Sequence, residues 1–317
     1  MLRKSITASG ARFGFGRTLP HVFGVVVGVG ITAVGRWFRA HRGRAVAIAG
    51  LGYSIGEAAL PRIATALEPM IGWRSVWLVV AFVMVAGLAP LIAWMARDER
   101  SPQSLTDAEL SPGRDGTHWT QTRVIRHWLI WALVPGILAH SFIGTVIFFQ
   151  VGHIAETMGW TKLAMTSAYP FFAVVTIVVA LIAGGLVDRF GPDRLLPFYL
   201  VPLGIGIAFV GPFEGIWSWW LGLALTGMSS GITHAMWGAL WAEIYGTRNL
   251  GSIKATASGF MVVGSAIGPG LTGLVIDLGV PFSGQTVWML TATLAISTGH
   301  LLIVARLPGR PAAEPKT

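Results

Sequence analysis

A short polar loop between two long apolar runs limits what this chain can fold into. Residues 184–194 read GGLVDRFGPDR, and the apolar segments on both sides are long enough to cross a membrane as helices. Gly191 suits the left-handed backbone of a tight reversal, and Asp188 can accept hydrogen bonds from a neighbouring helix end. Arg189 and Arg194 favour a cytoplasmic position for the loop. A basic turn between two spans is the simplest alternative.

Composition indicates a membrane protein with many spans. The 317 residues are 53% hydrophobic and 12% charged, with a mean hydropathy of +0.65, whereas soluble domains carry about 25% charged residues. The 41 glycines and 14 tryptophans suit packed membrane helices and interfacial aromatic belts. A net charge of +9 can indicate nucleic-acid binding, but basic residues also gather in cytoplasmic loops, so we expect no nucleic-acid partner. The chain has no cysteine, which excludes disulfides and thiolate chemistry.

Nine apolar segments of suitable length predict an all-α integral membrane bundle. They lie at about 18–37, 45–68, 75–96, 128–150, 165–187, 195–212, 216–241, 252–276 and 286–306. Residues 97–127 are polar, charged and interrupted by proline and glycine, which predicts a cytoplasmic linker. The linker separates a lobe of three spans at 18–96 from a six-helix lobe at 128–306. Tails occupy 1–17 and 307–317.

The distribution of basic residues predicts the orientation of the chain in the membrane. With the loop at 36–44 inside, 16 of the 23 Lys and Arg residues are cytoplasmic, as the positive-inside rule requires. The four basic residues of the N-terminal tail then fall on the outer side, which the same rule disfavours.

An internal repeat relates the two lobes. The pairs Gly56/Pro61 and Gly264/Pro269 have the same internal spacing and lie 208 residues apart, as in transporters built from parallel halves. Chance can also produce such matches, because glycine and proline are frequent in spans. Subtracting 208 from 128, where the second lobe begins, places the start of an equivalent first lobe about 80 residues before Met1. We therefore expect an N-terminal truncation that leaves the equivalents of helices 4–12 of a twelve-helix fold.

The loop pattern G-x-x-x-D-R-x-G-x-x-R, which begins at Gly184, resembles the signature loop of the major facilitator superfamily. In that family the loop joins the second and third helices of each six-helix half. Residues 36–45, RWFRAHRGRA, resemble the turn between helices four and five, and residues 264–270, GSAIGPG, resemble helix eleven. The first of these segments is closest to monocarboxylate carriers and oxalate–formate antiporters. The resemblance implies alternating access around a midplane site, with the signature loop closing the cytoplasmic side.

Two charged residues in the second predicted span are candidates for the site, because ionisable groups inside a membrane are costly. Glu57 follows Arg44 by 13 residues, which places it near mid-bilayer. It is a candidate for proton coupling or substrate contact, and a structural carboxylate explains it equally well. Arg62 can bind a carboxylate substrate, extend to the outer interface or form a structural ion pair.

Two histidines lie in the middle of other predicted spans. His234 shares a helix face with glycine and serine at 227, 230, 231 and 238, which predicts a face that lines a cavity or packs against a helix. Since imidazole titrates near neutral pH, His234 and His140 are candidates for proton relay, and hydrogen-bonded packing is the alternative. Trp237 can stack on a substrate or serve only in packing.

These features predict a secondary active transporter of a small solute, coupled to protons, with an organic anion as the leading substrate and with activity lost if the first lobe is incomplete. We expect no enzymatic activity and no cofactor, and no metal because the histidines lack ligand spacing. The expected partners are the solute and the lipid bilayer, in the inner membrane of a bacterium. An integral membrane enzyme and a non-transporting helix bundle are the alternatives. The sequence does not define the oligomeric state.

Overall fold

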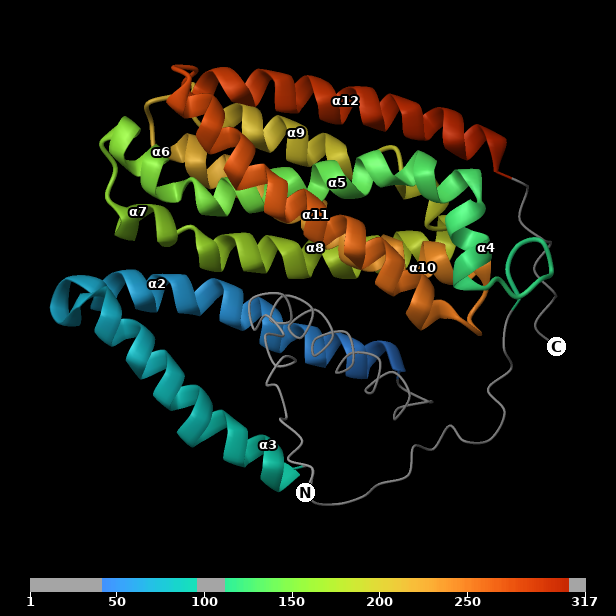
Figure 1. Ribbon diagram of the computed structural model, residues 1–317, viewed down its shortest axis with the longest axis horizontal. Coiled ribbons are helices and arrows are strands. Elements are labelled where there is room, and N and C mark those ends of the chain that lie inside the picture. The colour runs from blue at the N-terminus through green and yellow to red at the C-terminus, as the bar shows by residue number, and fades with distance from the viewer. Residues whose placement is uncertain (1–41, 96–111, 308–317) are drawn as a thin grey trace, which may run out of the picture. The chain divides into compact units, whose positions relative to one another are not determined.

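The computed structural model describes residues 42–95 and 112–307 (Figure 1). Helices account for most of these residues, and no strand occurs in either range. The prediction of an all-α membrane bundle is therefore confirmed. The predicted span at 18–37 lies outside the described residues.

Helix α2 (Arg42–Phe82) contains the turn that separates two predicted spans. Gly72 has φ 76° and ψ 152°, which are not helical values, and the chain turns back near this point (Figure 1). The turn falls between the predicted spans 45–68 and 75–96. Helix α2 continues into the π-helix η1 (Val83–Leu88) and helix α3 (Ala89–Met95). A glycine is needed here because the positive φ disfavours any residue with a Cβ.

Six helices follow, at the positions of the six predicted spans of the second lobe. They are α5 (Trp128–Phe149), α8 (Tyr169–Phe190), α9 (Leu200–Phe209), α10 (Trp217–Tyr245), α11 (Leu250–Asp277) and α12 (Phe282–Arg306). Short elements complete the region: α4 (Gln121–Arg126), α6 (Val151–Met158), α7 (Lys162–Thr166) and the 3-10 turn η2 (Asp193–Leu195). The six helices run side by side along the bundle, with α4 at one end and α6 and α7 at the other (Figure 1).

Five segments of the described chain are both long and apolar enough to cross a membrane. They are Ala59–Leu91, Trp128–Phe149, Lys162–Phe190, Leu250–Asp277 and Phe282–Arg306. Helix α9 has only 10 residues, because turns occupy much of the predicted span at 195–212. Helix α10 is long, but glycine, serine and threonine lower its hydropathy.

Glycines bring the main helix pairs into close contact. A Cβ added to Gly264 or Gly268 of α11 would lie 2.8 or 2.9 Å from a backbone oxygen of α5. A Cβ on Gly227 or Gly231 of α10 would lie 2.9 or 2.6 Å from a backbone oxygen of α8. Small residues at such crossings let membrane helices approach closely.

The described part of the predicted linker folds against one end of the six-helix lobe. The backbone N–H groups of Arg114 and Trp119 donate to the carbonyls of Ile244 and Tyr245, each at 3.3 Å. The Asn249 side chain donates to the Trp119 carbonyl at 2.8 Å. Residues 112–127 are thus fixed to the end of α10 and the start of α11.

Candidate functional site

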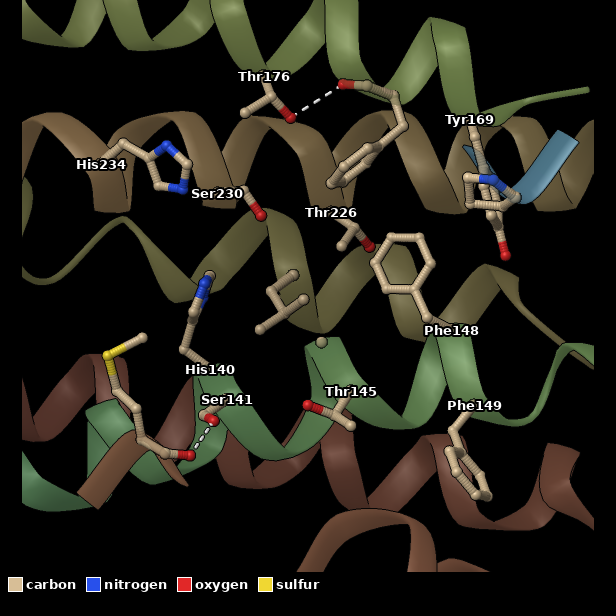
Figure 2. A pocket seen from close by; sticks show the side chains of 15 residues that line it. His140, Ser141, Thr145, Phe148, Phe149, Tyr169, Thr176, Thr226, Ser230 and His234 are labelled. Carbon is tan, nitrogen blue, oxygen red and sulfur yellow. Dashed lines mark hydrogen bonds between the residues drawn. The ribbon is translucent and has the colours of Figure 1, made fainter. Parts of the chain in front are cut away.

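A cavity of about 640 Å³ opens within the six-helix lobe (Figure 2). Helices α5, α8, α9, α10 and α11 contribute to its wall, and Pro61 of α2 also borders it. The lining residues are Pro61, His140, Ser141, Gly144, Thr145, Phe148, Phe149, Tyr169, Phe172, Thr176, Leu203, Thr226, Ser230, His234 and Met261. This volume suits a small molecule, and aromatic walls with a few polar groups are typical of ligand sites.

The structure brings together the two histidines that the sequence singled out. His140 on α5 and His234 on α10 both line the cavity, with Ser230 near them (Figure 2). Two imidazoles in one cavity wall can accept protons and can donate hydrogen bonds to a solute.

Hydrogen bonds around His140 define which ring nitrogen is available for a proton. The Ser229 hydroxyl donates to the Tyr199 carbonyl at 2.6 Å and lies 3.3 Å from His140 Nδ1. A hydroxyl has one hydrogen, so this oxygen can only accept from His140. The neutral ring must then carry its hydrogen on Nδ1, which leaves Nε2 as the proton acceptor.

Trp237 does not line the cavity. Its ring stacks on Trp241 with centroids 5.1 Å apart and meets Tyr199 edge-on at 5.7 Å. The structure therefore places Trp237 in aromatic packing between α10 and the start of α9. Of the two roles that the sequence left open, this geometry supports packing.

The two charged candidates of α2 stand apart from the cavity wall. Arg62 is exposed and its Nη1 donates to the Ser167 hydroxyl. A second contact also joins α2 to the end of α7, because the hydroxyls of Thr65 and Thr166 lie 3.0 Å apart. Glu57 belongs to α2, but its side chain lies outside the described part of the structure.

The loop at 184–194 has the expected turn. Gly191 ends α8 with φ 92°, a value that favours glycine. Gly184 lies within α8, and Asp188, Arg189 and Arg194 are exposed. Arg189 packs over the Phe190 ring at 5.1 Å. Asp188 makes no hydrogen bond or ion pair with any residue in the described ranges, so its proposed contact with another helix stays a prediction.

A buried charge cluster, formed by Arg114, Asp193 and Glu243, ties this loop to two other segments. Arg114 donates to Asp193 at 2.8 Å and, through Nε, to Glu243 at 2.9 Å. Only 4% of its side chain is exposed. Burial acts to lower the pKa of Arg114, but the hydrogen bonds and charges of Asp193 and Glu243 outweigh it and raise the pKa. The arginine therefore stays charged and holds residue 114, the loop and α10 together.

Sequence reasoning missed this charge cluster and most of the hydroxyls in the cavity. The three charged residues are separated by 79 and 129 positions, so no local pattern relates them. The hydroxyls did carry a signal. Thr226, Ser230 and His234 are spaced by four, which places them on one face of a helix.

Comparison with known proteins adds one finding. A family model described as the Major Facilitator Superfamily matches the chain twice, at residues 8–178 and 133–317. The two matches overlap and together cover nearly the whole sequence. A search among curated proteins found no significant match. Within the described residues, no group of three or more His, Cys, Asp or Glu side chains is arranged to hold a metal ion.

Proposed function

Because this chain belongs to the Major Facilitator Superfamily, whose members are secondary transporters, we propose that it moves a small organic anion across the membrane together with protons. The observation that carries the proposal is the cavity in which His140 and His234 face a shared space. Alternating access would expose this cavity to one side of the membrane at a time.

Proton coupling follows from the chemistry of the cavity wall. Among the described residues, the lining of the cavity contains two imidazoles and several hydroxyls but no lysine or arginine. An anion entering such a wall is best stabilised when an imidazole carries a proton, because charge-assisted hydrogen bonds are about twice as strong as neutral ones. Binding of the anion and of the proton would then favour each other. His140 Nε2 is the acceptor that its Ser229 contact leaves available.

The choice of an organic anion rests on two further points. Residues 36–45 resemble the monocarboxylate and oxalate–formate branch. Hydroxyls of Thr145, Thr226 and Ser230 supply neutral donors for carboxylate oxygens. Arg62, bonded to Ser167, would act outside the cavity wall, and Glu57 remains a second candidate for coupling.

We assign the cytoplasmic gate to the loop at 184–194. Its residues Asp188, Arg189 and Arg194 are exposed at the end of α8, where another lobe can contact them. The charge cluster supports this role, because Arg114 anchors the same loop through Asp193. The loop would thus present its exposed side from a fixed position.

Reconstitution into liposomes tests the function. The purified chain is placed in liposomes that contain a pH-sensitive dye, and a panel of mono- and dicarboxylates is added under an imposed pH gradient. We expect solute-dependent proton entry with at least one carboxylate. His140→Gln and His234→Gln should lose pH-driven uptake, while counterflow exchange continues because it needs no net proton movement. His153→Gln on α6 is the control, because His153 does not line the cavity.

Two outcomes would contradict the proposal. Uptake that is equally fast with and without the gradient would show that protons are not coupled. Equal loss of uptake and exchange in both histidine variants would show that these residues serve structure instead.

A further inference from the structure

A second polar site lies beside the cavity, where α12 and the start of α9 meet α5. His300 and Ser297 belong to α12, and Tyr199 directly precedes α9. Their exposed fractions are 1%, 6% and 0%. We call these three residues the buried polar cluster.

The polar atoms of the buried polar cluster lack hydrogen-bond partners within the described chain. This holds for both ring nitrogens of His300, the Tyr199 hydroxyl and the Ser297 hydroxyl. The Leu196 backbone lies near the His300 ring but does not meet hydrogen-bond geometry. Leaving one buried polar group unsatisfied costs about 1–3 kcal/mol, and buried polar groups nearly always have a partner. Four such atoms close together indicate that small polar molecules bind there and supply the missing hydrogen bonds.

The Tyr199 hydroxyl and His300 Nε2 are close enough for one water molecule to bridge them. The Tyr199 and His300 rings stack with centroids 5.8 Å apart. A Cβ on Gly136 of α5 would lie 2.5 Å from the Tyr199 hydroxyl and 2.9 Å from His300 Nε2. The two polar atoms are therefore at most about 5.4 Å apart, from the sum of these distances. One water can bridge such a gap, because each of its hydrogen bonds spans about 2.8 Å.

His140 connects the buried polar cluster with the cavity. Its ring centroid lies 6.1 Å from that of Tyr199, and Ser229 contacts both His140 Nδ1 and the Tyr199 carbonyl. His140 also follows Gly136 by one helical turn on α5. His140 thus both lines the cavity and borders the buried polar cluster.

We propose that the buried polar cluster is a hydrated proton-binding site, in which ordered water completes the hydrogen bonds of His300, Tyr199 and Ser297. A proton from water in the cavity reaches a ring nitrogen of His300 through the ordered water beside His140, and His300 becomes an imidazolium. Only N–H and O–H bonds form and break in this step. Of the elements packed on this part of α12, α9 brings Tyr199 and α5 brings His140. No charged side chain in the described ranges, α11 included, interacts with His300.

A role for this site in coupling rests on the proposed function, but its hydration and protonation do not. Both can be measured on the full chain in lipid nanodiscs with ¹⁵N-labelled histidine and no solute. His300→Asn assigns the His300 signals by their loss. We expect cross peaks between the His300 ring and water, and ring signals that move with pH between about 4 and 9, the range in which imidazoles titrate.

Variants separate the parts of the relay. Tyr199→Phe removes only the hydroxyl, so it should shift the His300 titration midpoint. His140→Phe should remove the fast exchange of His300 with cavity water. His153→Gln, at the α6 end of the bundle, should change neither. If Tyr199→Phe fails to fold, Ser297→Ala tests the same water network with a smaller change.

The outcomes are decisive in either direction. A His300 signal without water cross peaks, or one that stays constant across this pH range, would overturn the proposal. Equal effects of Tyr199→Phe and His153→Gln would also overturn it. If the His300 signature is present while liposomes show no pH-driven uptake, the buried polar cluster stands and the proposed transport function fails.

Discussion

At the scale of single residues, Arg114 determines whether two carboxylates can lie together at the end of the bundle. Asp193 and Glu243 both contact its guanidinium, and the arginine is almost fully buried. Removing one partner from a buried ion pair leaves uncompensated charge, which costs about 3–5 kcal/mol. Exposed ion pairs contribute much less, because water and salt screen them.

Arg114→Met should destabilise the protein by about 2 kcal/mol, less than for a fully buried pair, because it keeps much of the side-chain volume but removes the charge beside two partly exposed carboxylates. Thermal unfolding of the detergent-solubilised chain measures this as a fall in the midpoint. Arg123 is a matched control in the same segment. It is 53% exposed, pairs with Asp115 at 3.8 Å and stacks on Trp119. Arg123→Met should cost about 1 kcal/mol, and equal losses would contradict the importance of the buried charge cluster.

At the scale of helices, the crossing of α8 and α10 depends on small residues. At Gly231, an added Cβ would lie 2.6 Å from the Thr176 carbonyl and 2.9 Å from the Ala180 nitrogen. Both neighbours are backbone atoms, so neither can move without shifting a whole helix. Gly238 lies further along α10, where the nearest described atom to an added Cβ is the Lys254 ammonium nitrogen, at 3.5 Å.

The two glycines should respond to alanine with opposite signs. Gly231→Ala should lower stability by about 1–3 kcal/mol, because it overpacks the contact. Gly238→Ala should be neutral or raise stability by up to about 1 kcal/mol, because alanine favours helix more than glycine does. Thermal midpoints of both variants, measured side by side, check this. A stable Gly231→Ala protein would mean that α8 and α10 lie further apart than described.

Helices were predictable from the sequence wherever long apolar runs define them. The predicted span at 128–150 corresponds to α5, Trp128–Phe149. Turns within apolar sequence were harder, as the short α9 shows. The predicted span at 195–212 begins with turns rather than helix. Residues 196–199 are apolar, but they still belong to the connection that follows α8.

The site was predictable only in part, for a physical reason. His140 and His234 stood out because ionisable residues are rare in spans, and both line the cavity. Trp237 was also a candidate from the sequence, but its ring packs against Tyr199 and Trp241. His300 also lies in a predicted span. Which neighbours it meets depends on long-range packing, because those neighbours lie on α5 and before α9.

At the scale of the whole molecule, the surface is far more apolar than that of a soluble protein, and hydroxyl side chains lie among the buried residues. Hydroxyl side chains such as Thr226, Thr272 and Thr293 are at most 2% exposed. Large apolar side chains such as Leu181 and Leu302 are 66% and 64% exposed. Lipid satisfies the exposed apolar surface, whereas the polar groups must find partners inside the bundle. This arrangement fits a multi-pass protein whose interior surrounds a polar path.

Such a path makes a prediction about access that the natural lack of cysteine makes easy to test. Ser230→Cys places a thiol in the cavity, Arg248→Cys on the exposed turn before α11, and Glu214→Cys in the turn before α10. With a membrane-impermeant maleimide, Arg248→Cys should react only from the cytoplasmic side and Glu214→Cys only from the outside, as the positive-inside rule predicts. Ser230→Cys should react from both sides, with rates that change in opposite directions as pH changes, because protonation shifts the population between two access states. If the labelling rates of Ser230→Cys rise together from both sides, the cavity belongs to a continuous pore instead. If Ser230→Cys reacts from neither side, the cavity does not lie on the transport path.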